Sequence, residues 1–424
     1  MAERARRHIA RRLLPFLFVI YITNYLDRTN LAYATLGMSR DLHFSDRVFG
    51  TAFGIFFIGY TALQIPGALL VERWSARRLI AATMIVWGVL SGLTGWVHTT
   101  NQLYLARFLL GAAEAGFFPG VIVYLTHWFV YEDRAKAVAN FMAAIPFSFI
   151  IGSPLAGALL GVHWFGLQGW RWLFLLEGVP AVVLGVVTLF YLPDWPHDAE
   201  WLAPDERQWI TAELQREKLA KASSGSGSVL AALRSGRVML LAAVVIFSYT
   251  GYYAFISWFP TMLKRLSMFS DFRVGLFGSL PYIAAFIAMQ VNGWHSDRTR
   301  ERRWHVAIPL FLGAAALLPL SSLPRSVPLT LGLFTLVAVS VNAYLPAFWA
   351  LPSALLSDSA AAASIGFINT LGNLGGFCGP YLIGYLYNRT HSFTPGLSCM
   401  VAALAVAGIL VLFCPREPTG QTAT

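Results

Sequence analysis

The sequence is poor in charged residues and in cysteine. Asp, Glu, Lys and Arg make up 12% of its 424 residues, against about a quarter in an average soluble domain. The three cysteines have neither a metal-ligand spacing nor the pattern of a disulfide framework. No P-loop, nucleophile elbow or HExxH motif occurs, so we expect no enzymatic activity, no cofactor and no metal. All nine histidines fall in loops or near predicted helix ends, which argues against a histidine proton relay inside a membrane.

Apolar residues instead dominate the whole length of the chain. They make up 57% of it, and the mean hydropathy is +0.59. Runs of about twenty apolar residues, the length that crosses a bilayer as a helix, recur from end to end. The basic N-terminal stretch has no cleavage-site pattern, so we interpret it as the start of a retained first helix. We therefore predict an all-α membrane protein with twelve transmembrane helices in two six-helix bundles. The helices are expected near residues 13–34, 49–71, 79–97, 103–127, 138–161, 171–192, 237–263, 274–295, 305–322, 328–356, 361–387 and 394–414.

The net charge of +10 is explained by membrane topology. With the N-terminus in the cytoplasm, most of the 31 Lys and Arg residues fall in segments on that side, as the positive-inside rule requires. Both termini are then cytoplasmic, and no nucleic-acid partner is needed to account for the basic charge. We expect a multi-pass protein embedded in the lipid bilayer of a bacterial cytoplasmic (inner) membrane.

A polar interruption after the sixth predicted helix divides the sequence into two halves. It predicts an N-terminal bundle over residues 1–192, a cytoplasmic central loop over 193–236 and a C-terminal bundle over 237–424. The halves resemble each other at an offset of about 225 residues, since an acidic-Arg-x3-Arg-Arg loop follows the second helix of each. These loops begin at Glu72-Arg73 and Asp297-Arg298. Repeats in the same orientation are typical of parallel-repeat transporters.

The paired loops resemble the cytoplasmic signature of the major facilitator superfamily. Other motifs are similar to those of its anion:cation symporter family, and of the bacterial tartrate, phthalate and sugar-acid transporters within it. They are Asn24-Tyr25-Leu26-Asp27-Arg28-Thr29-Asn30, Arg107-x3-Gly111-x2-Glu114-x-Gly116-x2-Pro119, Trp201-Leu202-x-Pro204-x-Glu206-Arg207, His295-Ser296-Asp297-Arg298 and Gly366-x2-Asn369-x3-Gly372-Asn373-x-Gly375-Gly376. The glycine that usually follows the acidic-Arg pair is replaced by Ser75 in one half and by Arg300 in the other. These replacements leave open whether the cytoplasmic turn is as tight as the turn that glycine makes.

Four charged residues within predicted membrane helices stand out, namely Asp27, Arg28, Arg107 and Glu114. Such side chains are costly in hydrocarbon and usually face a substrate or ion path. Because arginine keeps its charge and binds carboxylates with two N–H groups, we predict Arg28 as the main ligand of an anionic substrate and Arg107 as the second. Glu114 and Asp27 each have an arginine available, so substrate arriving at that arginine would change their protonation and couple transport to protons. The alternative is that the four charges only neutralise one another in fixed buried pairs.

Polar and aromatic residues on several helices complete the predicted site. The resemblance implies that helices 1, 4, 7 and 10 line a central cavity. The further substrate contacts that we predict are Asn24, Tyr25, Tyr253, Asn369 and Asn373, with ordinary packing as the competing interpretation of the aromatic ones. Helices 7 and 10 carry no embedded charge, so we expect charge and coupling in the first half and hydrogen bonds and aromatic walls in the second.

The charged loop residues call for a separate interpretation. We expect Glu72, Arg73, Asp297 and Arg298 to form a cytoplasmic gate at most, with loop anchoring as the alternative.

The function that these residues predict is secondary active transport. We expect proton-coupled symport of a small organic anion by alternating access, the anion being a hydroxy acid, a sugar acid or an aromatic carboxylate. Anion exchange or sodium-coupled transport is the nearest alternative, and a non-transporting membrane sensor is the alternative from another class. We expect a monomer whose partners are the anion and protons.

Overall fold

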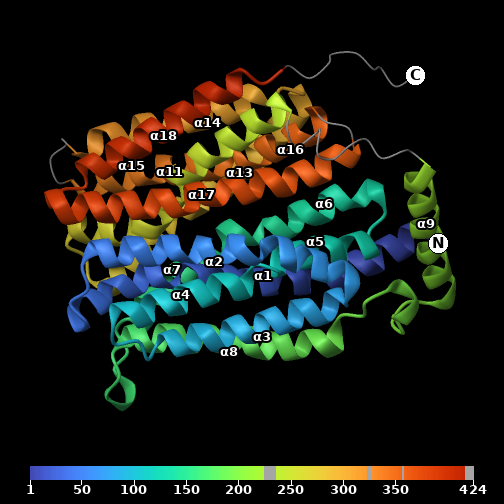
Figure 1. Ribbon diagram of the computed structural model, residues 1–424, viewed down its shortest axis with the longest axis horizontal. Coiled ribbons are helices and arrows are strands. Elements are labelled where there is room, and N and C mark those ends of the chain that lie inside the picture. The colour runs from blue at the N-terminus through green and yellow to red at the C-terminus, as the bar shows by residue number, and fades with distance from the viewer. Residues whose placement is uncertain (224–234, 322–325, 356–357, 416–424) are drawn as a thin grey trace. The chain divides into compact units, whose positions relative to one another are not determined.

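The computed structural model describes residues 1–223, 235–321, 326–355 and 358–415, and for a few residues within its helices only the backbone (Figure 1). Every regular element in those ranges is a helix, so the all-α prediction is confirmed. The elements are α1 (Ala2–Asp41), α2 (Asp46–Arg73), α3 (Ala76–Thr94), α4 (Thr100–Glu114), α5 (Phe117–Trp128), α6 (Tyr131–Met142), α7 (Ala144–Leu159), η1 (Trp164–Gly166), α8 (Gly169–Tyr191), η2 (Pro196–Asp198), α9 (Pro204–Ser223), α11 (Gly236–Ser267), α12 (Asp271–Gly278), α13 (Leu280–Thr299), α14 (Arg303–Leu317), η3 (Leu318–Ser321), α15 (Val327–Ala343), α16 (Leu345–Leu355), α17 (Asp358–Thr390) and α18 (Thr394–Leu412).

The predicted membrane segments all coincide with these helices. In the described part of the chain, 11 helical segments are long and apolar enough to cross a membrane. The remaining predicted segment, 361–387, corresponds to α17, whose 33 residues also exceed the length that a bilayer requires. The twelve-helix architecture therefore agrees with the structure.

Four of the predicted segments are each divided into two helices, and each division comes just before a proline. Pro119 lies in the first turn of α5, Pro146 in that of α7, Pro281 in that of α13 and Pro346 in that of α16. Proline has no N–H to donate to the preceding turn, but it is tolerated in the first turn of a new helix. The proline positions thus explain why these spans are interrupted.

The chain forms two compact units. The first comprises Met1–Asn30, Ile58–Phe149 and Val162–Gly225, and the second comprises Leu31–Phe57, Ile150–Gly161 and Ser226–Thr424. Parts of α1, α2 and α7 therefore group with the later helices. The predicted bundle boundaries at 193–236 remain a prediction.

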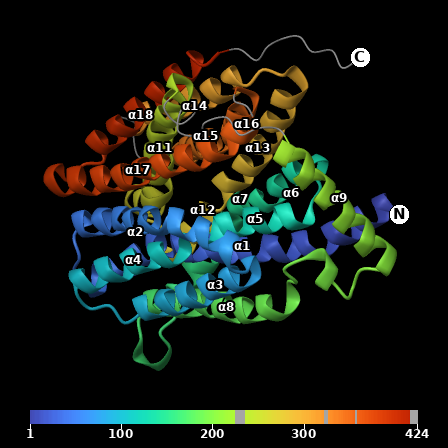
Figure 2. The same cartoon turned by 45° about the vertical axis from the view of Figure 1, so that its right-hand side comes forward.

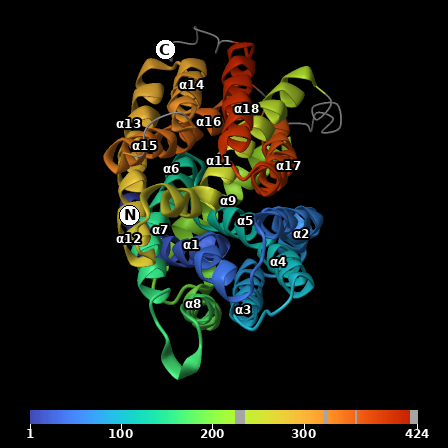
Figure 3. The ribbon, with the colours of Figure 1, turned by 90° about the vertical axis from the view of Figure 1, so that its left-hand side faces the viewer.

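In the first unit, α3 and α8 pack closely along each other (Figures 1 and 3). Glycine makes this approach possible, because a Cβ added to Gly178 would lie 2.5 Å from the carbonyl oxygen of Gly88. A Cβ on Gly88 would lie 2.7 Å from the carbonyl oxygen of Gly178. Small residues facing each other are the usual means by which membrane helices approach closely. The contact holds the interior face of α8 against the middle of α3.

In the second unit, α17 packs along α11, and α14 packs against α15 and α18 (Figures 2 and 3). Glycines again set the helix spacing. Added Cβ atoms on Gly375 and Gly379 would lie 2.2 Å and 2.1 Å from the carbonyl oxygens of Ile246 and Thr250. These two glycines are four residues apart and so lie on one face of α17. They bring Asn373 and its neighbours close to the tyrosines of α11.

The short helix α9 is attached to the N-terminal end of α1, also within the first unit (Figure 2). The buried carboxylate of Glu206 accepts hydrogen bonds from Arg4 Nε at 2.6 Å and from the backbone N–H of Ala203 at 3.2 Å, and it lies 3.1 Å from His8 Nδ1. Burial raises the pKa of Glu206, but the hydrogen bonds from His8, Arg4 and Ala203 outweigh it and hold the pKa below its usual value. The Trp201 ring stacks on Trp128. The motif around Glu206 is therefore explained by the docking of α9.

Candidate functional site

The centre of the candidate site is an ion pair between α1 and α4. Arg28 donates from Nε and Nη2 to Oε2 of Glu114, at 3.1 Å and 2.9 Å, and Asn24 Nδ2 donates to the same oxygen at 3.0 Å. Glu114 has no exposed surface in the described structure, and 11% of the Arg28 side chain is exposed. Removing one partner of such a buried pair typically costs about 3–5 kcal/mol, because the other charge is left uncompensated. The predicted substrate ligand and the predicted proton-coupling acid are thus bound to each other.

The local fold explains how Glu114 is presented. It is the last residue of α4, and the chain passes through Ala115 and Gly116 before α5 begins. A Cβ on Gly67 would lie 2.8 Å from the Cα of Gly116, so the break is packed directly against α2. Glu114 therefore lies at an interruption of the span rather than within one continuous helix.

Aromatic rings surround the guanidinium group of Arg28. Its Cζ atom lies 5.2 Å from the ring centre of Tyr25 and 5.0 Å from that of Tyr60. Cations are attracted to aromatic faces at such distances. Tyr25 also packs against Tyr21, with 5.2 Å between ring centres. The rings thus help to hold Arg28 in place beside the carboxylate that it binds.

Asp27 has a different environment from its neighbour Arg28. It points toward α3, where Ser91 Oγ donates to its Oδ1 at 2.6 Å and Trp87 Nε1 donates to its Oδ2 at 3.1 Å. Asn30 donates to the Ser91 hydroxyl at 3.2 Å and extends this network. Asp27 has no exposed surface in the described structure. Its carboxyl group is thus held by neutral donors.

Arg107 lies on α4 and is 2% exposed. Its charge interacts with those of Glu114, Arg28 and Asp27, so the four charged residues singled out in the sequence belong to one electrostatic cluster. The cluster contains two acids and two bases and is therefore balanced when all four are ionised.

A fifth buried charge, Glu177 on α8, is missing from the sequence-based list. It is 3% exposed, and the charge of Asp27 acts on it. The signal that identified Asp27 and Glu114 was also available for Glu177, since it is an acidic residue within the apolar run 171–192. The predicted inventory of embedded charges was thus incomplete.

The candidates in the second half of the sequence lie in the second unit. The ring of Tyr253 is 6% exposed and packs against Phe57 and Tyr252, with 4.4 Å and 4.9 Å between ring centres. Asn373 is buried on α17, and Asn369, one turn earlier, is partly exposed. They form a neutral, aromatic environment within that unit.

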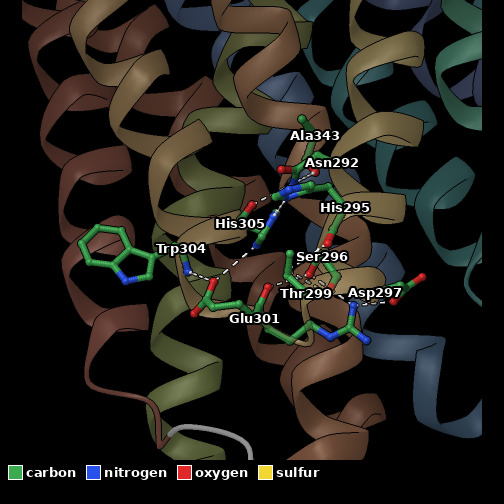
Figure 4. Close-up of polar contacts among 10 residues, drawn as sticks. Asn292, His295, Ser296, Asp297, Thr299, Glu301, Trp304, His305 and Ala343 are labelled. Carbon is green, nitrogen blue, oxygen red and sulfur yellow. Dashed lines mark hydrogen bonds and ion pairs between the residues drawn. The ribbon is translucent and has the colours of Figure 1, made fainter.

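The predicted gate residues have separate surroundings. The side chains of Glu72 and Arg73 lie outside the described part of the structure. Asp297 forms an ion pair with Arg302 (Figure 4). The Cζ atom of Arg298 lies 5.5 Å from the ring centre of Trp294. Asn292 donates to the backbone carbonyls of His305 and Ala343, which links α13 to its neighbours. These contacts fit the loop-anchoring interpretation and leave the gate as a proposal.

The two departures from the usual glycine have local explanations. Arg300 has φ of 53°, in the left-handed region that favours glycine, and it ends α13. Ser75 has φ of −132° and caps α3, accepting from the N–H of Arg78 at 3.0 Å and donating to Asp194. The second loop thus keeps the turn that glycine would make, whereas the first replaces it with a helix cap.

Ion pairs not anticipated from the sequence occur elsewhere in the second unit. Arg265, at the end of α11, donates to Asp46 at the start of α2 at 2.7 Å. Asp271, in the first turn of α12, pairs with Arg40 and with Lys264. No group of three or more His, Cys, Asp or Glu residues able to hold a metal is found among the residues the structure describes.

The fold and the buried charges define a class of protein, a multi-pass helical membrane transporter. The solved structure of a bacterial homolog to the human lysosomal transporter Spinster, in an inward-facing and occupied conformation, has a TM-score of 0.77 to this chain, 17% identity and 96% coverage of each chain. At this level of identity the likeness concerns the fold alone.

The chain belongs to the Major Facilitator Superfamily, whose family description matches residues 17–380. It is 44% identical over 417 residues to a "Putative tartrate transporter" of Agrobacterium vitis, covering 98% of this chain and 96% of that protein. It is 36% identical over 409 residues to a "Putative metabolite transport protein NicT" of Pseudomonas putida, covering 96% and 93%. The predicted family is therefore confirmed, and with it a membrane transporter rather than an enzyme.

Proposed function

We propose that the protein is a proton-coupled symporter that imports a small organic anion by alternating access. The observation that carries the proposal is the buried pair of Arg28 and Glu114. A cation that binds carboxylates is held by a titratable acid, so an incoming carboxylate and Glu114 compete for the same N–H groups. Transport of the anion and protonation of Glu114 are thereby linked.

The proposed cycle has two exchanges at one guanidinium group. The substrate carboxylate takes the place of Glu114 at Arg28 Nε and Nη2, and Glu114 then takes up a proton because a buried charge without its partner is costly. Oε1 of Glu114 accepts no hydrogen bond from the described residues and offers a place for that proton. When the substrate leaves, Glu114 releases the proton and returns to Arg28. Arg107 supplies further positive charge, and Asp27 is the second candidate acid.

The substrate class follows from the site and from the relatives. Two arginines suit a carboxylate, and Asn24 and Tyr25 offer groups for hydroxyls or a ring. The 44% identical relative is named for tartrate, so hydroxy acids and sugar acids come first, and aromatic carboxylates second.

Tyr253, Asn369 and Asn373 are proposed as neutral contacts. We also propose a monomer in the bacterial inner membrane with both termini cytoplasmic, and a cytoplasmic gate that includes Asp297 and Arg298.

Uptake by reconstituted vesicles tests the proposal. Tartrate, a sugar acid and an aromatic carboxylate are offered under an imposed pH gradient, an imposed sodium gradient or neither. Accumulation driven by the pH gradient alone, and lost in Arg28→Ala, is the expected result. Accumulation driven only by sodium indicates a sodium-coupled carrier, and exchange without accumulation indicates an exchanger. Binding without flux would indicate a sensor.

A further inference from the structure

Glu177 is a buried acid that the proposed cycle does not use. It lies in the middle of α8, is 3% exposed, and belongs to an otherwise apolar run. Its Oε2 atom accepts no hydrogen bond from any residue the structure describes. Burying a carboxylate without hydrogen-bond donors or a cation is expensive, so this side chain requires an explanation.

The neighbouring helix places Glu177 next to the environment of Asp27. A Cβ on Gly178, the next residue, would lie 3.4 Å from the Cβ of Ser91 on α3. The hydroxyl of the same Ser91 donates to Asp27 at 2.6 Å. The close packing of α3 and α8 thus places the turn of α8 that carries Glu177 against the part of α3 whose serine holds Asp27.

No cation compensates Glu177 within the described part of the first unit. Asp27 is the one charged group found to act on it. The charged residues of α3 are Arg77 and Arg78, in its first turn, and Arg77 pairs with Asp194. On α8 itself, Arg171 is directed to the carbonyl oxygen of Gly95 at 2.7 Å.

The surroundings of Asp27 stabilise a charged carboxylate better than those of Glu177 do. Asp27 receives two hydrogen bonds, from Trp87 and Ser91, and the positive charge of Arg107 acts on it, although Glu114 opposes it. Among the described residues, Glu177 has neither a hydrogen-bond donor to its Oε2 atom nor a neighbouring cation. Two carboxylates close together in a medium of low dielectric constant cannot both be ionised at reasonable cost. When two acids have such different surroundings, the better stabilised one carries the charge and the other carries the proton.

We propose that Glu177 is a further proton-binding residue of the transporter, sharing one proton with Asp27, and that this proton crosses the membrane with the substrate. In the state described, Glu177 holds the proton and Asp27 is ionised. When Arg107 turns toward a bound anion, Asp27 loses part of its compensating charge and takes the proton from Glu177. No other atom is transferred, and the net charge of the two carboxyl groups stays at minus one. The inference rests on the proposed proton-coupled function but concerns a site separate from the Arg28–Glu114 pair.

Infrared difference spectroscopy tests the proton-binding step without any substrate. The purified full-length protein is titrated with acid and base, and the C=O stretch of protonated carboxyl groups is followed. The expected result is a buried-carboxyl band that is lost in Glu177→Gln and shifts in Asp27→Asn. Glu213→Gln, on α9 and partly exposed, is the matched control and should leave the band unchanged. A wild-type band that persists unaltered in Glu177→Gln would overturn the proposal.

Vesicle uptake tests whether that proton is transported. Each coupled proton contributes about tenfold accumulation per unit of pH gradient, because one pH unit corresponds to about 1.4 kcal/mol. Glu177→Gln should therefore accumulate about tenfold less substrate at a gradient of about one unit, while substrate exchange at equal pH is retained. Equal accumulation by wild type and Glu177→Gln overturns the inference but leaves the proposed symport standing. Absence of pH-driven accumulation in the wild type overturns the proposed function itself.

If Glu177→Gln does not fold, Glu177→Asp is the second variant. It keeps the carboxyl group and should shift the infrared band while preserving accumulation. An unshifted band counts against the proposal.

Discussion

The two units of the molecule differ in what they bury. Every charged side chain buried in the described structure belongs to the first unit, namely Asp27, Arg107, Glu114, Glu177 and Glu206. The buried polar residues that the structure describes in the second unit carry hydroxyl or amide groups. They include Ser248, Ser340 and Asn342, and all three bond to neighbouring groups within that unit.

The difference indicates that the two units of this transporter, which is built from repeats, have different roles. A buried charge costs several kcal/mol unless it is compensated, so a cluster of them is maintained only where it has a function. The neutral groups of the second unit can contact a substrate without changing its charge or taking up a proton. We therefore propose that the first unit recognises charge and that the second contributes shape and hydrogen bonding.

The largest effect is expected from removing a cation in the first unit. Arg28→Ala leaves Glu114 buried without its ion pair and removes the proposed carboxylate ligand, at a cost of about 3–5 kcal/mol. We expect carboxylate uptake to fall by at least about a hundredfold. Arg28→Lys, the matched control, keeps the charge but loses the forked geometry and should retain part of the activity. Wild-type KM in Arg28→Ala would contradict the assignment of charge recognition to this residue.

Placing a charged residue in the interior of the second unit tests whether that unit tolerates a buried charge. Ser248 is fully buried on α11 and accepts a hydrogen bond from Tyr344 at 3.0 Å. Ser248→Asp introduces a carboxylate with no cation there, so we expect a loss of roughly 3 kcal/mol in unfolding free energy. Ser248→Ala should lose only about 1 kcal/mol. Thermal unfolding of the detergent-solubilised protein measures both, and an equally stable Asp variant would show that the second unit tolerates charge.

A smaller effect is expected from a neutral contact in the second unit. Tyr253→Phe keeps the ring that packs against Phe57 and removes only the hydroxyl. The loss of one hydrogen bond to substrate is worth about 1 kcal/mol, so KM should rise by about fivefold with proton coupling unchanged. Uptake kinetics at several pH values measure both quantities. A change in the proton dependence would contradict the neutral role of this unit.

The smallest effect concerns the buried acid that holds α9. Because the pKa of Glu206 is lowered in the folded protein, its contribution to stability is present above the ordinary glutamate range and is lost as pH falls through the folded pKa. Hydrogen exchange in α9 should therefore accelerate below about pH 4, by less than about tenfold since Arg4 is largely solvent-exposed. Glu206→Gln should remove this acid dependence. Uptake driven by a pH gradient should remain, because this acid lies apart from the transport cluster.

Much of the fold could be predicted from the sequence because long apolar runs report directly on membrane helices. The positions of Asp27, Arg28, Arg107 and Glu114 followed from the cost of charge in those runs. Their partners did not, since hydrophobicity does not specify which helices pack together. The donors to Asp27 come from Trp87 and Ser91 on α3, and only the structure brings them there. The left-handed backbone of Arg300 could not be inferred from an arginine in the sequence.

Glu177 is a different case. Its acidic residue type and its apolar surroundings were both visible in the sequence, and the rule applied to the other embedded charges applies to it as well. What the sequence could not reveal is its proximity to Asp27, which depends on the contact between Gly88 and Gly178. A charge inside an apolar run can thus be detected from sequence, whereas its electrostatic role depends on helix packing.

The most direct test of the central claim is pH-driven uptake by Glu114→Gln in reconstituted vesicles. Glutamine preserves the size of the side chain and an acceptor for Arg28 and Asn24, but it cannot gain or lose a proton at neutral pH. We predict that proton-driven accumulation of the organic anion disappears while exchange of substrate at equal pH continues. Accumulation at the wild-type level in Glu114→Gln would contradict the account.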